Sequence, residues 1–236
     1  LGLIICAVYY EHQVYQASPI RKHFLYMLAL PAIFLSTDRS LVDPTWTLAQ
    51  SVSNAIKGGT CAVIFRESDL PTKARQTVFD FFRKAVPDDV LLLISDPDIS
   101  FDLSQVSGIH CDFSGGPIEV KSAGFLRGKT LTSLSDAGDT AQNWDYFTIY
   151  LDWNDPVSAI ETVKKFTAVS NRPLIVGKDP PLSLIASLFN VGISGIELTF
   201  AACGAYNKTE AVAEYQKQIS EYFYQTSGVN HGDAKR

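Results

Sequence analysis

The stretch that decides the fold is Val90-Leu91-Leu92-Leu93-Ile94, five aliphatic residues in a row between Asp88-Asp89 and Ser95-Asp96. A strand with one solvent face would alternate polar and apolar residues, so this unbroken run indicates a strand buried on both faces. Strands of that kind belong to parallel sheets that are covered by helices. The stretch therefore predicts an α/β fold with a parallel sheet at its centre.

Similar short runs lie on both sides of this stretch and alternate with segments of helical periodicity. Asp43-Pro44 and Asp155-Pro156 each predict a helix start, with aspartate as N-cap and proline at the first helical position. Only weak helices are expected between the third and fifth strands. The eight expected strands are Ala32–Ser36, Cys61–Phe65, Val90–Ile94, Ile109–Cys111, Thr130–Leu134, Tyr146–Leu151, Leu174–Gly177 and Ile193–Leu198.

Eight strand–helix units in succession predict a closed (β/α)₈ TIM barrel, because each crossover helix returns the chain to the same end of the sheet. The rival fold, an open doubly wound sheet, would need a glycine-rich first turn. The turn here reads Thr37-Asp38-Arg39-Ser40, which favours the barrel. We expect one barrel domain over residues 31–224, an N-terminal extension over 1–30 with a capping helix at Ser18–Leu30, and a polar C-terminal tail over 225–236.

Composition limits the classes of partner. The 236 residues are 46% hydrophobic and 19% charged, which suits a large buried core. A formal net charge of −5 argues against nucleic acid as a partner. The apolar stretches Leu1–Tyr10 and Phe24–Leu35 are shorter than the roughly 20 residues that a membrane span needs, so no membrane partner is expected. The four cysteines form no C-x-x-C pair, which favours buried thiols and a cytoplasmic protein.

Short motifs at the ends of the expected strands resemble those of one enzyme family. The most specific is Val63-Ile64-Phe65-Arg66-Glu67-Ser68-Asp69-Leu70, which is similar to the pattern V-Q-L-R-E-K-D-L. Leu35-Ser36-Thr37-Asp38-Arg39 resembles L-x-T-D-R, Ile94-Ser95-Asp96 resembles I-N-D, and Ser107-Gly108-Ile109-His110 resembles D-G-V-H. Because the motifs occur in order, the chain resembles the thiamin-phosphate synthase family and its thiazole tautomerase relatives over nearly all of residues 31–224.

The resemblance implies a transferase of thiamine biosynthesis that joins a pyrimidine pyrophosphate to a thiazole phosphate with Mg²⁺. Its site would lie at the C-terminal mouth of the barrel. The resemblance implies Asp96 as a magnesium ligand, and substrate or phosphate contacts from Arg66, Ser135, Gly177 and Lys178. No residue receives a catalytic role. The expected ligand is a small phosphorylated heterocycle or pyrophosphate, and a second copy of the chain (a homo-oligomer) is a further candidate partner.

Other positions depart from the family pattern. The lysine of the second strand is Ser68 here, and the phosphate-gripping loop after the sixth strand is replaced by Asp152-Trp153-Asn154-Asp155. Phe200 stands where a phosphate-contacting serine belongs, and Asp112 is the only acid available to replace the second metal ligand. Losing one charge-assisted contact costs about 1.5–3 kcal/mol. We therefore expect the parent activity to be undetectable or very weak.

Each of these residues also has a structural interpretation. Arg66 is either an anion ligand or an ion-pair partner of a nearby acid, Asp96 either binds metal or caps a turn, and Lys178 either replaces a lost cation or is a solvated loop residue. His110 is more typical of a buried structural histidine than of an acid–base catalyst. Three functions stay open: a diverged transferase, a repurposed enzyme of the tautomerase type, and a barrel without catalysis that serves as a binding or structural module.

Overall fold

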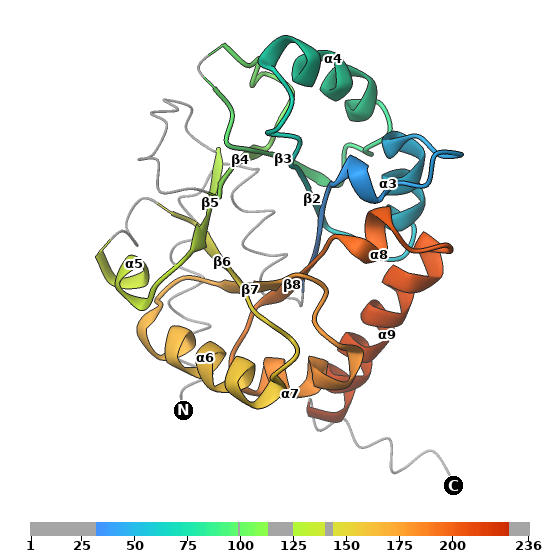
Figure 1. The fold of residues 1–236 in the computed structure, drawn as a ribbon. Helices are drawn as coiled ribbons and strands as arrows, with labels where there is room; N and C mark the ends of the chain where they lie inside the picture. The colour runs from blue at the N-terminus through green and yellow to red at the C-terminus, as the bar shows by residue number, and fades with distance from the viewer. Residues whose placement is uncertain (1–31, 99, 113–124, 140–143, 227–236) are drawn as a thin grey trace, which may run out of the picture.

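Eight parallel strands form a closed barrel in chain order, with β1 pairing against β8 (Figure 1). The computed structural model describes residues 32–98, 100–112, 125–139 and 144–226. The strands are β1 (Ala32–Ser36), β2 (Ala62–Phe65), β3 (Leu91–Ser95), β4 (Gly108–Cys111), β5 (Leu126–Leu131), β6 (Tyr146–Tyr150), β7 (Leu174–Gly177) and β8 (Gly195–Leu198). The predicted TIM barrel is confirmed.

Helices cover the outside of the barrel (Figure 1). They are η1 (Arg39–Leu41), α3 (Leu48–Ile56), α4 (Thr72–Arg83), α5 (Leu134–Asp139), α6 (Pro156–Val169), η3 (Leu182–Leu184), α7 (Ile185–Asn190), α8 (Phe200–Cys203) and α9 (Lys208–Thr226). α9 packs against α3 and so joins the last unit to the first. The capping helix expected at Ser18–Leu30 lies outside the described residues, and the helix α9 extends to Thr226, two residues beyond the expected end of the barrel domain.

The strands bury both of their faces, as the aliphatic run in β3 predicted. Successive side chains of a strand point to opposite sides, so β1 sends Ile33 and Leu35 towards the helices and Phe34 into the barrel. The apolar part of the inner layer consists of Phe34, Ala62, Ile64, Leu91, Leu93, Leu126, Tyr146 and Ile175. The barrel interior is thus a packed core rather than a pore, and any site for a ligand must lie at one of its ends.

The fifth strand was predicted wrongly. It was expected at Thr130–Leu134, but β5 spans Leu126–Leu131 and Leu134 begins α5. The carboxylate of Asp136 accepts hydrogen bonds from the N–H groups of Thr132 and Ser133, which ends the strand and begins the helix. The true strand was obscured by Gly128, where a Cβ would lie 2.0 Å from Cζ of Tyr146. The close approach of this tyrosine dictates glycine there, despite its low strand propensity.

One of the two predicted helix starts was also wrong. Asp43 accepts a hydrogen bond from the Thr45 N–H at 2.8 Å and so stabilises a turn, not a helix start. The helix α3 begins later, with Thr47 as N-cap in a reciprocal capping box with Gln50. The second helix start is confirmed, since Asp155 caps α6 through the N–H of Ser158 at 3.1 Å.

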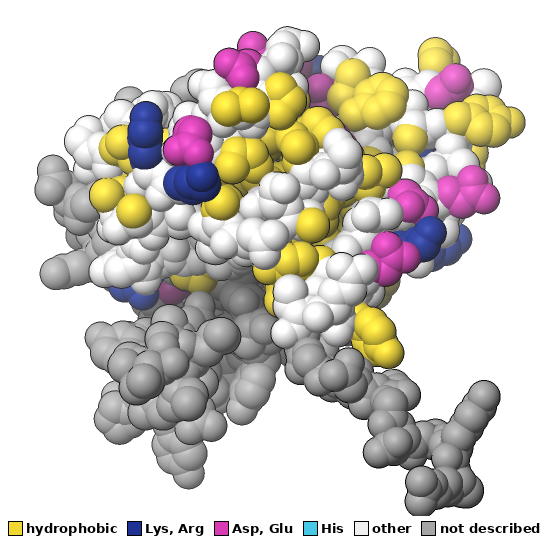
Figure 2. Space-filling model, turned by 90° about the horizontal axis from the view of Figure 1, so that it is seen from below, with side chains coloured by type: hydrophobic (Ala, Val, Ile, Leu, Met, Phe, Trp, Pro, Cys, Tyr) yellow, Lys and Arg dark blue, Asp and Glu magenta, His cyan; other side chains and the backbone are white. Residues whose placement is uncertain are grey.

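Charged side chains of both signs are interspersed with apolar and neutral ones on the face that Figure 2 shows. None of the helices in the described ranges is both long enough and apolar enough to span a bilayer. The cytoplasmic location stays a prediction.

Candidate functional site

The C-terminal ends of the strands surround a cavity of about 800 Å³. Seven of the eight strand ends contribute to its wall, all except that of β3. The ionisable residues that line it are Asp38, Arg39, Arg66, Glu67, Asp69, Asp112, Tyr150, Lys178 and Asp179. The cavity lies at the end of the barrel where sites of this fold occur.

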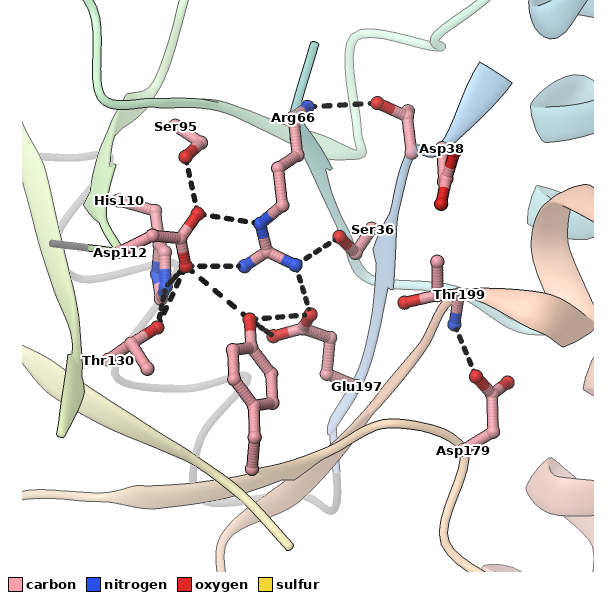
Figure 3. A network of polar contacts seen from close by, with 12 residues as sticks. Ser36, Asp38, Arg66, Ser95, His110, Asp112, Thr130, Asp179, Glu197 and Thr199 are labelled. Carbon is pink, nitrogen blue, oxygen red and sulfur yellow. Dashed lines mark hydrogen bonds and ion pairs between the residues drawn. The ribbon is translucent and has the colours of Figure 1, made fainter. Parts of the chain in front are cut away.

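Arg66 occupies the centre of a polar network where the cavity meets the barrel core (Figure 3). Its Nε and Nη2 donate to the two carboxylate oxygens of Asp112 at 2.7 and 2.9 Å. Its Nη1 donates to Glu197 Oε1 at 2.7 Å and also to the hydroxyl of Ser36. These contacts use four of the five N–H groups of the guanidinium. The ion-pair interpretation of Arg66 therefore holds, with Asp112 and Glu197 as partners instead of the nearer acids in the sequence.

The electrostatics of this network keep Arg66 and Asp112 ionised. Burial lowers the pKa of Arg66, but the nearby Glu197, Tyr150 and Asp112 outweigh burial and raise that pKa well above its ordinary value. Burial would likewise raise the pKa of Asp112, yet His110, Arg66 and Ser95 hold it far below its usual range. Asp112 and Arg66 are therefore charged at neutral pH, and each neutralises the other.

His110 lies beneath this network and is fully buried. Its Nδ1 is 2.9 Å from the hydroxyl of Tyr146, and its Nε2 is 2.9 Å from Thr130 Oγ1 and 3.3 Å from Asp112 Oδ1. The ring is not part of the cavity wall. The contacts agree with the structural interpretation, in which His110 links the inner core to the carboxylate of Asp112.

Asp96 lies beside Asp112 and outside the cavity wall. Its Oδ1 accepts from the N–H of Asp112 at 3.1 Å, and its Oδ2 is 3.2 Å from the hydroxyl of Ser95, which is also 2.5 Å from Asp112 Oδ2. Burial and the charge of Asp112 raise the pKa of Asp96. Asp96 has a φ of 38°, a left-handed conformation that aspartate tolerates better than most residues. Its side chain thus links the ends of β3 and β4 and caps no helix of the described residues, while Asp98 holds the local turn by accepting from the Ser100 N–H at 2.9 Å.

The residues present fit a magnesium ion poorly. Asp112 follows β4 directly and would be the natural second ligand, but both of its oxygens accept from Arg66. Ser95 and Thr130 add a second hydrogen bond to each oxygen, which leaves no lone pair for the octahedral shell of Mg²⁺. In the described ranges no three or more His, Cys, Asp or Glu side chains group to hold a metal. Magnesium at Asp96 stays a prediction.

The carboxylate of Asp179 lies beside Thr199, at the start of α8 (Figure 3). It accepts from the backbone N–H groups of Thr199, Phe200 and Ala201 at 3.0, 2.9 and 3.0 Å. These groups begin α8, the short extra helix after β8, where barrels of this fold frequently bind phosphate. An internal carboxylate thus occupies the amides that would face a ligand. Lys178 and Asp179 both have positive φ, 63° and 48°, so strained backbone positions this carboxylate.

Of the other three residues predicted to contact substrate or phosphate, two lie at the mouth of the barrel and one does not. Lys178 lines the cavity, with its Nζ 5.5 Å from the centre of the Tyr150 ring. No carboxylate of the described residues lies within ion-pair distance of it. Gly177 is buried at the end of β7, where a Cβ would lie 2.3 Å from Cε1 of Tyr150. Ser135 is exposed in α5, hydrogen-bonded to Ser133 and outside the cavity wall. Arg66, Gly177 and Lys178 come together at the mouth, and Ser135 does not join them.

Sequence reasoning missed the role of Arg39, a third cation at the mouth. Its Nη1 donates to Glu67 Oε2 at 2.8 Å and to Asp69 Oδ1 at 2.7 Å, and its Nη2 donates to Asp69 Oδ2. The signal was available, because the motifs that contain Arg39 and Glu67 follow neighbouring strands. Side chains that follow parallel neighbouring strands lie at the same edge of the sheet, so Arg39 after β1 can bind carboxylates that follow β2.

The cavity wall carries an excess of negative charge. Five of its residues are acidic (Asp38, Glu67, Asp69, Asp112, Asp179) and three are basic (Arg39, Arg66, Lys178). Two of the basic residues already bind carboxylates. The mouth is therefore a poor place for a ligand with several negative charges, because the field of the wall repels it.

Comparisons with known proteins agree with the fold. No protein-family model and no curated protein matches the sequence. Among solved structures, thiamine phosphate pyrophosphorylase from Pyrococcus furiosus is similar with a TM-score of 0.67 and 21% identity, over 81% of this chain and 96% of that one. (S)-3-O-geranylgeranylglyceryl phosphate synthase from Thermoplasma acidophilum, in complex with sn-glycerol-1-phosphate, is similar with a TM-score of 0.63 and 15% identity, over 87% of this chain and all of that one. At these identities the likeness shows the fold, which is the fold that the motifs predicted.

Proposed function

We propose that this chain is a thiamin-phosphate synthase-like barrel whose mouth binds a small molecule but does not transfer a pyrimidine from its pyrophosphate. The observation that carries the proposal is the state of Arg66. Asp112 and Glu197 bind its guanidinium from two sides, and the hydroxyl of Ser36 accepts a hydrogen bond from it as well. The strand-end cation of the most specific motif shared with the synthase family is thereby neutralised inside the protein.

The transferase reaction needs positive charge that binds the departing pyrophosphate better than it binds the ground state. Arg66 would have to leave two buried carboxylates to supply that charge. Breaking a buried ion pair and leaving one partner uncompensated costs about 3–5 kcal/mol. The backbone N–H groups at the start of α8 are also already hydrogen-bonded, because Asp179 accepts from three of them. Neither group is available without a structural rearrangement.

The cavity itself supports binding of a small molecule. Its volume of about 800 Å³ falls within the range of roughly 300–1,000 Å³ that small-molecule sites occupy. Leu41, Tyr150 and Phe200 give the wall apolar surface, and the hydroxyls of Thr130 and Thr132 supply donors and acceptors. A pocket with apolar walls and a few convergent polar groups is typical of a site for a small organic ligand.

Lys178 favours a second candidate function, a diverged transferase that acts on a phosphorylated heterocycle or pyrophosphate. Its ammonium group lines the cavity after β7 and has no carboxylate partner among the described residues. The Thermoplasma acidophilum barrel was solved with sn-glycerol-1-phosphate, so a barrel of this fold does hold a phosphorylated small molecule. In this alternative Lys178 would replace one of the lost cations.

A steady-state assay for thiamin phosphate separates the two candidates. The purified chain is supplied with the pyrimidine pyrophosphate, the thiazole phosphate and Mg²⁺, beside the Pyrococcus furiosus enzyme as positive control. We expect no product, and we expect Ser68→Lys to restore none, because Arg66 and the α8 amides would stay occupied. Turnover within about tenfold of the control, roughly 1.4 kcal/mol in barrier, would overturn the proposal and establish the transferase.

A further inference from the structure

Glu67 is the one carboxylate of the cavity wall that is almost completely buried and also lacks a partner for one oxygen, as far as the described residues show. Its exposed fraction is 1%, and its Oε1 has no hydrogen-bond partner. Its other oxygen, Oε2, accepts from Arg39 at 2.8 Å. An unsatisfied buried acceptor costs about 1–3 kcal/mol and more when it is charged. A donor that reached Oε1 would recover that free energy.

The surroundings of Glu67 favour a positively charged donor. Burial raises the pKa of Glu67, the nearby Thr37 and Arg39 limit the rise, and the negative charge of Asp38 adds to it. A cation between Glu67 and Asp38 would relieve both the burial cost and the repulsion. Lys178 is the cavity cation without a carboxylate partner, but it follows β7, and β8 and β1 separate β7 from β2.

In the structure, Arg39 is the cation that binds Glu67. Its side chain is 39% exposed, and it follows β1 in the short 3-10 helix η1. It also donates to both oxygens of Asp69, whose side chain is 65% exposed. Arg39 can therefore keep the bidentate contact with Asp69 while it gives up the single contact with Glu67. A ligand cation would then take its place at Glu67.

On these grounds the geometry points to a cation-binding subsite at Glu67, between the ends of β1 and β2, that takes a small primary amine with an apolar body. The inference rests on the proposed function, since it names the class of molecule that the mouth binds. Glu67 accepts from the ammonium group, Asp38 adds a second negative charge beside it, and Leu41 and Phe200 offer apolar wall for the rest of the ligand. Leu41 and Phe200 are 38% and 57% exposed and gain most from being covered.

A metal ion and an anion explain the same observations less well. A metal would need several oxygen or nitrogen ligands, and the described residues offer no such group of three at this place. An anion would meet Glu67, Asp38 and Asp69 together. An organic ammonium needs only one or two acceptors and uses the apolar wall as well, which is what this part of the cavity provides.

The test compares two probes of the same shape that differ in charge, benzylamine and benzyl alcohol, by isothermal titration or ligand-observed NMR at low ionic strength. We expect benzylamine to bind about tenfold more tightly or better, since a hydrogen bond to a charged group contributes more than one between neutral groups. Glu67→Gln should weaken benzylamine by about tenfold and leave benzyl alcohol nearly unchanged. Glu161→Gln, on the exposed face of α6, is the matched control and should change neither probe.

Arg39→Gln gives a second variant with the opposite expected sign. It removes the competitor for Glu67, so benzylamine should bind several-fold more tightly, and thermal melting confirms that both variants are folded. Equal affinity of the two probes, an unchanged affinity in Glu67→Gln, or weaker binding in Arg39→Gln would each overturn the cation subsite. Those results would leave the proposed function intact if benzyl alcohol still binds. Thiamin phosphate formation would instead refute the proposed function.

Discussion

Replacing Arg66 with methionine should lower the free energy of unfolding by about 3–5 kcal/mol at pH 7. Methionine keeps much of the side-chain volume but removes all four hydrogen bonds to Asp112, Glu197 and Ser36. The two carboxylates would stay behind at 12% and 0% exposure without a counter-charge. A domain of this kind is stable by about 5–15 kcal/mol in total, so the variant would stand close to unfolding.

The deficit should shrink as the pH falls. In the parent the pKa of Asp112 is depressed, so its contribution to stability is present above the unfolded pKa and is lost as the pH falls through the folded one. Arg66 is one of the groups that lower the pKa of Asp112 against the effect of burial. Without it, the pKa of Asp112 in the folded variant is higher, and Asp112 binds a proton at higher pH. A raised carboxyl pKa favours the folded state at low pH. The difference between parent and variant is therefore largest at neutral pH and smaller near pH 4.

Urea unfolding followed by tryptophan fluorescence at pH 7 and near pH 4 measures both effects. Arg83→Met is the control, because Arg83 pairs at 2.7 Å with Asp88, whose side chain is 96% exposed. Exposed ion pairs contribute about 0–1 kcal/mol, so this variant should lose little at either pH. A loss below about 1 kcal/mol in Arg66→Met, or an equal loss at the two pH values, would refute the buried double ion pair.

Two further changes test local features of the barrel. Gly128→Ala should destabilise the protein by about 1–3 kcal/mol or more, because the new Cβ would lie 2.0 Å from Cζ of the buried Tyr146. A lower melting temperature would show this loss of stability. An unchanged melting temperature would mean that Tyr146 has room to move. Asp179→Ser should expose the amides at the start of α8 and create sulfate binding that the parent lacks, measured by titration, whereas Asp155→Ser at the N-cap of α6 should create none. If both serine variants behave alike, Asp179 does not stand in for a bound anion.

The barrel was predictable from the sequence because its information is local. Aliphatic runs such as those of β2 and β3 identify strands buried on both faces, and their succession with helical segments fixes the order. β5 was the exception, because Gly128 is required by Tyr146, a residue on the neighbouring strand that enters the barrel core. No local pattern carries that requirement. The strand was consequently expected to start four residues too late and to end three residues too late.

The sequence predicted where the site lies, but not which groups its charged side chains bind. The motif around Arg66 placed a cation at the mouth, and the structure places it there. Its partners are 46 and 131 residues away in the sequence, so their contact depends on barrel closure and not on any short pattern. The contact of Asp179 with the amides of α8 could not be predicted either. It depends on positive φ at two successive residues, Lys178 and Asp179, and neither residue type indicates a positive φ in the sequence.

The internal carboxylates also bear on whether the mouth is only structural. Asp112 and Glu197 accept hydrogen bonds from Arg66, and Asp179 accepts from the amides of α8, so these donors are satisfied within the protein. Stability alone does not explain why the positions are polar, because well-packed apolar residues of similar volume are often as stable as a buried ion pair or more so. A purely structural module would also gain nothing from the second carboxylate oxygen of Glu67, because Oε1 has no hydrogen-bond partner among the described residues. A carboxylate that carries an unmet hydrogen bond at the wall of a cavity is a cost to folding that a ligand can offset. That asymmetry favours a binding function over a purely structural one.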